Sequence, residues 1–215
     1  MTIRAKLYTA IVVAVAGLAI TVGVAAWAMN ELGNRFDDVQ RAADARALAL
    51  RLKFGVTDFN GWQTAYGYDD GKSRPIYVAA FRRFQDDLAA ARRVLESSDE
   101  TRLLDRIDAA AVDFDRLDAV AWAALQAGRT EQVKRIFLGP EIMNFHLAAA
   151  GAQQLAELED ANARAQAREF EDARDDALRV LVGAGIVSAL LIVILLVTAM
   201  DLARQAEGKL EPGEG

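Results

Sequence analysis

Two long apolar stretches, one near each end of the chain, constrain its fold more than any other feature. Residues 7–29 and residues 180–200 contain no charged side chain, whereas the segment between them is rich in Arg, Asp and Glu. Each stretch is about 21 to 23 residues long, which is enough for a helix to cross a hydrocarbon core of ~30 Å. Charged side chains are costly in lipid, so the intervening segment must lie in water. We therefore expect two membrane-spanning helices that flank one water-facing domain.

The charges beside the apolar stretches predict the orientation of the chain. Arg4 and Lys6 precede the first stretch, and Arg204 and Lys209 follow the second. Arg179 lies on the other side, just before the second stretch, and so reduces the excess of basic residues on the terminal sides without reversing it. Short basic flanks tend to remain cytoplasmic, whereas long domains translocate largely regardless of charge. We expect a two-pass protein of the inner (plasma) membrane, with both termini cytoplasmic and residues 30–179 extracytoplasmic.

This topology predicts four parts. They are a cytoplasmic stub with the first span (1–29), an extracytoplasmic domain (30–178), the second span (179–200) and a short cytoplasmic tail (201–215). One alternative concerns the first span, because basic residues, an apolar stretch and Ala26-Trp27-Ala28 imitate a cleavable signal peptide. The apolar stretch is longer than in such signals, and the bulky Trp27 adjoins the cleavage point. Both features favour an uncleaved anchor.

The composition argues against several classes of function. The net charge is -6, whereas a nucleic-acid-binding protein would carry a basic face. The chain has no Cys and a single His, His146, which leaves no thiolate or His-based metal site and no Ser/His/Asp triad. Phosphate-loop and dinucleotide-binding motifs do not occur in it. We expect no enzymatic activity, no cofactor, no metal ion and no nucleic-acid partner.

Breakers divide the middle of the chain into helices. We predict helices over residues 30–68, 75–97, 98–128 and 130–138, and a last helix that follows Gly139-Pro140 and continues into the second span. Two of them carry the four-three apolar spacing of coiled-coil seams: Tyr77, Phe81, Phe84, Leu88, Ala91 and Leu95, and then Leu103, Ile107, Ala110, Phe114, Leu117, Ala121 and Ala124. Short links between helices that leave and re-enter one membrane predict an all-α fold, in which an up-down-up-down antiparallel four-helix bundle lies between two transmembrane helices.

The helix over residues 30–68 carries two apolar stripes on opposite sides. One contains Ala43, Ala47, Leu50, Phe54, Thr57, Gly61 and Ala65, and the other contains Ala45, Leu48, Leu52, Phe59 and Tyr66. A helix on the outside of a monomeric bundle needs only one buried face. We therefore expect a parallel homodimer through this helix, with Leu48, Leu52 and Phe59 as candidate interface residues. The alternative is that both stripes are buried within one monomer.

The most distinctive segment of the same helix is residues 58–66, DFNGWQTAY. Asn60-Gly61 is poor helix material, and a Gly at such a place usually has a packing or functional reason. Carboxylate, amide, indole and phenol groups beside apolar surface are typical of a small-ligand pocket, so the candidate ligand-binding residues are Asp58, Asn60, Trp62, Gln63 and Tyr66. The alternative is purely structural: Gly61 permits close helix approach, and Trp62 and Tyr66 cap the end of the bundle.

The stretch DFNGWQTAYGYD, following a long helix off an N-terminal span, resembles the sensor portion of bacterial methyl-accepting chemotaxis receptors with a four-helix outer part. Leu125 and Gly128, followed by residues 130–137, are similar to the hinge before the last helix of that group. The resemblance covers residues 1 to about 200. It implies a receptor that binds a small ligand or partner outside the cell and signals by a small displacement of its last helix.

The chain departs from that family after the second span. The receptors continue into a HAMP linker and a long cytoplasmic coiled coil, which residues 201–215 are too short to supply. We therefore expect a receptor module without its own output domain, acting as a homodimer or as a mixed dimer with full-length receptors. The alternative function is a membrane-anchored structural or interaction protein that pairs through its helices with other receptors.

Overall fold

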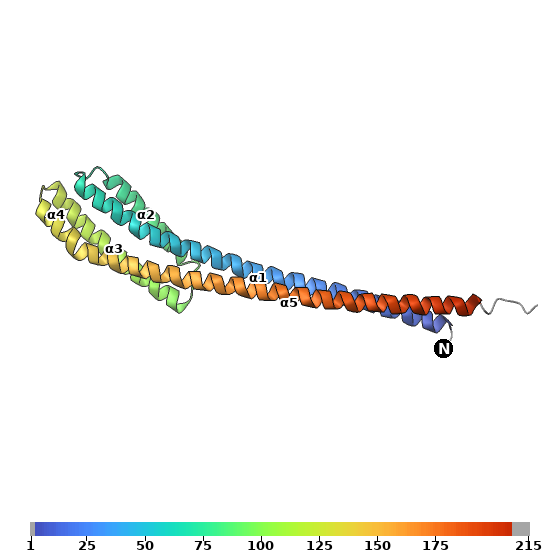
Figure 1. Cartoon of the computed structure of the whole chain (residues 1–215). Coiled ribbons are helices and arrows are strands. Elements are labelled where there is room, and N and C mark those ends of the chain that lie inside the picture. Colours follow the sequence, from blue (N-terminus) through green and yellow to red (C-terminus); the bar gives the residue numbers. More distant parts are fainter. Residues whose placement is uncertain (1–2, 208–215) are drawn as a thin grey trace, which may run out of the picture. The chain divides into compact units, whose positions relative to one another are not determined.

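The computed structural model describes residues 3–207, and within that range the chain is helical with no strand. Figure 1 shows the elements in order along the chain. They are α1 (Ile3–Tyr68), α2 (Arg74–Ala91), α3 (Ser98–Gln126), α4 (Thr130–Ile136), the π-helical turn η1 (Phe137–Glu141) and α5 (Ile142–Glu207). The predicted all-α class is therefore confirmed for the described residues, as are the breaks near residues 69, 128 and 139.

The predicted boundary between the second and third helices needs a correction. α2 ends at Ala91 rather than near residue 97. The cap of α3 is Ser97, directly before the predicted start of this helix at residue 98: its side chain accepts from the Glu100 N–H, and the Glu100 side chain accepts from the Ser97 N–H. This reciprocal capping box satisfies two amides that the first turn would otherwise leave unpaired, and so it fixes the start of α3.

The chain divides into two compact units. The central unit comprises residues 39–166, and the terminal unit comprises residues 1–38 and 167–215. α1 and α5 each contribute to both units, whereas α2, α3, α4 and η1 belong to the central unit alone.

One hydrophobic core fills the central unit, with side chains from α1, α2, α3 and α5. The whole predicted seam of α2 is buried in it, as is the seam of α3 except for the half-buried Leu117. Phe59 of α1 lies at the centre, with its ring 5.0 to 5.2 Å from the rings of Phe81, Phe84 and Phe114. Aromatic pairs at this spacing add directional contacts to the burial of their area. The four-three spacing therefore identified the core side of these helices.

The core corrects the candidate dimer interface. Leu48, Leu52 and Phe59 are all buried within one chain, so this face of α1 is not free for a second molecule. The opposite stripe is the exposed one: Phe54 is 70% and Leu50 46% exposed. The sequence shows that α1 has two apolar faces, but it does not show which of them packs on the neighbouring helices of the same chain, because both have the same period.

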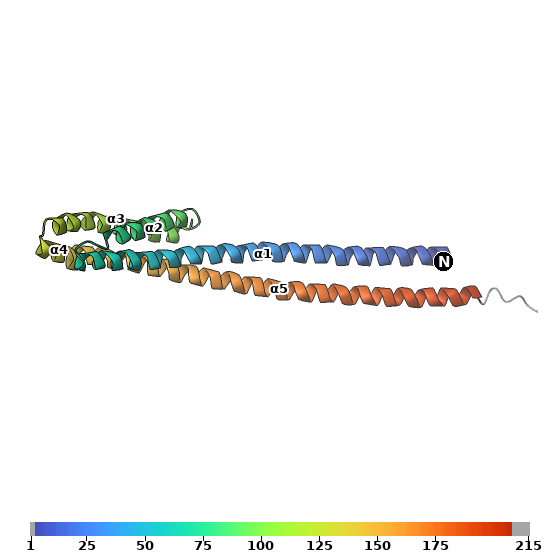
Figure 2. The same ribbon diagram turned by 90° about the horizontal axis from the view of Figure 1, so that it is seen from above.

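The terminal unit contains the two apolar stretches, which lie in the only two described helices that are long and apolar enough to cross a membrane. Within this unit the stretches approach each other at small side chains: the Thr21 and Ser188 hydroxyls hydrogen bond at 2.6 Å, and Gly17 lies against Leu191. Figure 2 shows the first and last parts of the described chain running along each other. Large apolar side chains such as Leu18 and Leu190 remain exposed on both stretches.

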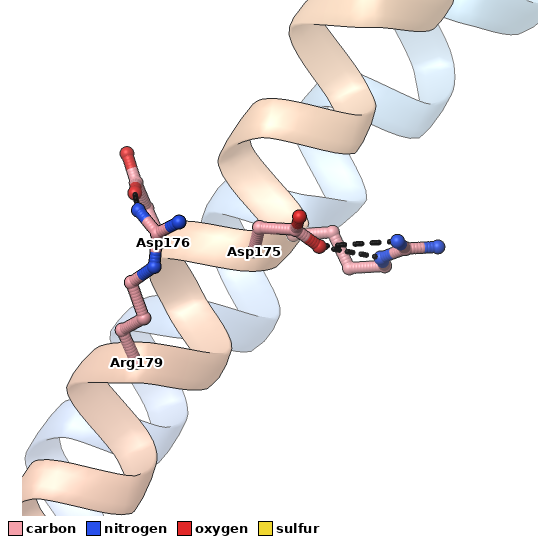
Figure 3. A network of polar contacts seen from close by, with 4 residues as sticks. Asp175, Asp176 and Arg179 are labelled. Carbon is pink, nitrogen blue, oxygen red and sulfur yellow. Dashed lines mark hydrogen bonds and ion pairs between the residues drawn. The ribbon is translucent and has the colours of Figure 1, made fainter.

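A patch of charges precedes the second apolar stretch. Arg174 pairs with Asp175 and Arg179 with Asp176, each at 3.0 Å, and all four side chains are exposed. In Figure 3, Asp175 and the Asp176–Arg179 pair project from different sides of α5. Exposed pairs of this kind add little stability. Their importance is that they mark an abrupt change from charged to apolar surface at Arg179.

Candidate ligand-binding site

The central unit contains a cavity of about 470 Å³ where α1 ends and α5 begins. Residues of α1, α3, α4, η1 and α5 line it: Asn60, Gln63, Thr64, Gly67, Tyr68, Leu125, Thr130, Val133, Lys134, Phe137, Leu138, Glu141 and Ile142. Most of the surface area of this wall is apolar, although seven of the thirteen lining residues carry a polar side-chain group. A mostly apolar hollow with a small number of polar side chains is the usual form of a small-molecule site.

Glu141 is the most unusual group of the cavity wall. Its side chain is almost fully buried, at 1% exposure, and neither carboxylate oxygen has a hydrogen-bond partner among the described residues. Burial, with a smaller contribution from Asp118, raises the pKa of Glu141 to about 8, although Arg74 and Gln63 oppose the shift. Buried carboxylates are normally paired, so an unpaired one in a cavity is a candidate for ligand contact.

Gln63 supplies the second polar group of the cavity. It is 3% exposed, and its Nε2 atom has no acceptor among the described residues. The Gln63 amide lies close enough to Glu141 to lower its pKa slightly, but the two groups do not complete a hydrogen bond. An unpaired buried donor costs about 1–3 kcal/mol. Two residues that line the same cavity therefore carry buried polar atoms with unmet hydrogen bonds.

The break between α4 and α5 explains how Glu141 reaches the cavity. Gly139 has φ -114° and ψ -107°, which are not helical values, and the ring of Pro140 prevents the helix from continuing unchanged. The chain passes through a π-helical turn here, a rare form that often occurs at functional sites. Phe137 packs against Gly67, where any Cβ atom would overlap its ring. The turn thus closes one side of the cavity and directs Glu141 inward.

The structure brings only two of the five predicted ligand residues to this cavity. Asn60 and Gln63 line it. Asp58 and Trp62 do not: the Trp62 indole N–H donates to Asp58 at 3.0 Å, and Arg83 pairs with the same carboxylate at 3.1 Å. Asp58 and Trp62 lie one turn apart on α1, and they bond to each other rather than line the cavity.

Tyr66, the fifth predicted residue, is part of the core. It is fully buried, and its hydroxyl donates to Asp118 of α3, which also forms an ion pair with Arg74 of α2. The Arg74 guanidinium lies 4.7 to 5.2 Å from the ring centres of Tyr66, Tyr77 and Trp122. Burial, and then the nearby Asp118 carboxylate, raise the pKa of Tyr66. This cluster joins three helices and leaves the phenol no free position for a ligand.

The structural alternative for the same segment is only partly supported. Tyr66 is in the core and Trp62 packs against it, as expected for residues that close the end of a bundle. Gly61, however, faces open space, since a Cβ atom there would have no neighbour within 4 Å. The prediction that Gly61 permits close approach of a second helix is therefore wrong within one chain.

Sequence reasoning missed Glu141 and the apolar wall formed by Val133, Phe137 and Leu138. A weak signal was present: Glu141 is an acidic residue directly after Gly139-Pro140, at the start of an Ala-rich helix with apolar residues on both sides. Nothing in the spacing shows that this side chain turns inward, because the conformation of the π-helical turn decides it.

The described residues contain no group of three or more His, Cys, Asp or Glu side chains that could hold a metal ion. Comparisons of the chain with protein-family models, with curated proteins and with solved structures yield no match.

Proposed function

We propose that this protein is a transmembrane sensory receptor module that binds a small molecule in the cavity at the end of α1. The observation that carries the proposal is the buried, unpaired Glu141 carboxylate in a mostly apolar cavity of ligand size. The resemblance of residues 58–69 to the sensor portion of chemotaxis receptors supports the same class of function. In this proposal the central unit is an antiparallel four-helix bundle outside the cytoplasm.

The exposed apolar surface of the terminal unit supports insertion into the inner membrane. In the two apolar windows only 6% and 0% of the residues are buried, whereas the core helix of a protein in water would be mostly buried. Side chains such as Val15 and Ile194 therefore need an apolar solvent. In this proposal the helices cross the membrane twice, with both termini on the cytoplasmic side, as the basic flanks predict, and the central unit on the other.

α5 provides the route from the cavity to the membrane. It begins at Ile142, a residue of the cavity wall, and continues as one helix through residues 180–200. A ligand held between Gln63 of α1 and Glu141 beside α5 would favour one arrangement of these two helices over another. The size of this shift is limited by the difference between the ligand's affinities for the two arrangements. In a mixed dimer, the same displacement would be passed to the partner receptor.

Homodimers of the module would form through the exposed apolar stripe of α1, namely Ala43, Ala47, Leu50, Phe54, Thr57 and Gly61. This stripe is the one left uncovered by the core, and two copies anchored in one membrane would present it in the same direction. A buried pair of such faces removes apolar area from water.

Cysteine crosslinking tests this interface, because the natural chain contains no Cys. Leu50→Cys and Phe54→Cys are expected to give symmetric disulfide-linked dimers in membranes under mild oxidation. Leu52→Cys, buried on the opposite side of α1, is the matched control and should remain monomeric. Equal crosslinking at positions 52 and 54, or none at position 54, contradicts dimerisation through this face.

The receptor function is tested by ligand-induced stabilisation of the full chain in lipid nanodiscs. A specific ligand raises the melting temperature by mass action. We expect at least one compound of a broad small-molecule panel to stabilise the wild type but not Thr64→Phe, in which a ring is added at the cavity wall. A complete lack of hits, with a membrane protein co-purifying, would instead favour the alternative of a membrane-anchored interaction protein.

A further inference from the structure

The polar groups of the cavity define the chemistry of a ligand more narrowly than its size does. We propose that the cavity binds a compact organic cation, a primary ammonium group on an apolar body, with the Glu141 carboxylate as its counter-ion. The proposal rests on the proposed function, since it names the ligand class of the same site.

The walls suit the apolar body of such a ligand. Five apolar side chains from four different elements line the cavity: Leu125, Val133, Phe137, Leu138 and Ile142. A six-carbon ring can exchange water for these side chains and gain the free energy of apolar burial. The cavity is too small for a folded peptide segment, which favours a ligand of a few heavy atoms.

The charges around Glu141 favour a cation over an anion. Asp118 adds a second negative charge from α3, and the one nearby guanidinium, Arg74 of α2, is already paired with Asp118. Lys134 of α4 is the only cation on the cavity wall, but it is largely exposed and pairs with Glu131 at 2.9 Å. The inner end of the cavity therefore combines an unpaired acidic group with no free positive charge among its described lining residues.

An ammonium group also fits the two unpaired acceptor oxygens of Glu141, whereas the unpaired Nε2 of Gln63 is a donor that it does not satisfy. It carries three donors and no acceptor, so in this proposal it donates to the Glu141 carboxylate and to the side-chain oxygen of Asn60 or Gln63. Hydrogen bonds between charged partners are about twice as strong as neutral ones. A neutral alcohol would offer a single donor and no charge.

Binding of a cation should release a proton near neutral pH. The groups that act on Glu141 are Gln63 of α1, Arg74 of α2, Asp118 of α3 and Tyr66 of α1, and Lys134 of α4 lines the same cavity. In the empty cavity the pKa of Glu141 is about 8, so the carboxyl group is mostly protonated at neutral pH. The ammonium ligand requires the ionised form, and its affinity should therefore rise as the pH increases from 6 toward 9.

Three probes of one shape test the proposal: cyclohexylamine, cyclohexanol and cyclohexanecarboxylate, titrated calorimetrically into the full chain in nanodiscs. We expect cyclohexylamine to bind more tightly than the other two, with proton release into the buffer at pH 7. Glu141→Gln should weaken it by about 10-fold or more. Glu157→Gln, an exposed acid of α5, is the matched control and should leave the affinity unchanged.

The outcomes separate the ligand class from the function itself. If cyclohexanol or the carboxylate binds as well as the amine, and Thr64→Phe blocks it, the cation proposal is wrong while the cavity remains a ligand site. Amine affinity that survives Glu141→Gln also overturns the proposal. If none of the three probes binds, the cation proposal fails; if the wider panel then gives no hit sensitive to Thr64→Phe, the receptor function fails with it.

Discussion

Asp118→Ala is expected to destabilise the central unit by about 3–5 kcal/mol, the usual cost of removing one partner of a buried ion pair. The carboxylate is fully buried, and it accepts hydrogen bonds from the Tyr66 hydroxyl and from Arg74. Its removal leaves a guanidinium and a phenol without an acceptor among aromatic rings. Urea unfolding of the detergent-solubilised chain, followed by fluorescence, measures the change, because Trp122 lies against this cluster.

Asp113→Ala is the matched control for that experiment. Asp113 lies on the same helix and forms an ion pair with Arg116 at 2.9 Å, but both side chains of this pair are exposed. Such pairs contribute about 0–1 kcal/mol. Equal losses of stability in the two variants would show that the buried contacts of Asp118 with Tyr66 and Arg74 do not stabilise the packing of α1, α2 and α3.

Glu141→Gln is expected to stabilise the folded chain at alkaline pH while having little effect at acid pH. The pKa of Glu141 is raised from 4.5 to about 8 on folding, so the folded state holds a proton that the unfolded state has lost between these two values. The contribution of Glu141 to the free energy of unfolding is therefore fully present below pH 4.5. It is lost as the pH rises from 4.5 through 8. At pH 9 the neutral amide should be favoured by on the order of 3 kcal/mol.

The measurement for this prediction is the difference in unfolding free energy between the variant and the wild type from pH 5 to pH 9. Glu159 also has a raised pKa, about 7, caused by burial and by Glu100, but it is present in both proteins and cancels in the difference. A difference that does not grow with pH would mean that Glu141 is not buried as a neutral acid. Glu157→Gln serves as the exposed control.

Apolar periodicity predicted the helices and most of the core, because a seam such as the one from Tyr77 to Leu95 can be buried on only one side of a helix. The same argument failed for α1, which carries two stripes. Phe59 and Phe54 are equally apolar, yet Phe59 is at the centre of the core and Phe54 is exposed. Which stripe is covered depends on helices that are distant in the sequence.

The candidate site was predictable only on the side formed by α1. Residues 58–66 were recognisable as unusual, and Asn60 and Gln63 do line the cavity. Trp62 and Tyr66 are residue types that often bind ligands, but their polar atoms donate hydrogen bonds to Asp58 and Asp118. Glu141 was not predicted because the non-helical backbone at Gly139 sets the direction of its side chain. Such a backbone conformation produces no periodic pattern in the sequence.

We propose that two membrane-crossing helices hold residues 39–166 outside the cytoplasm. Single cysteines introduced into the Cys-free chain at Ser98 and at Arg204, both exposed positions, test it with a membrane-impermeant maleimide. We expect intact cells, with any outer envelope made permeable, to be labelled at position 98, and position 204 to react only after the inner membrane is opened. Labelling of position 204 in intact cells, or protection of position 98, would contradict it.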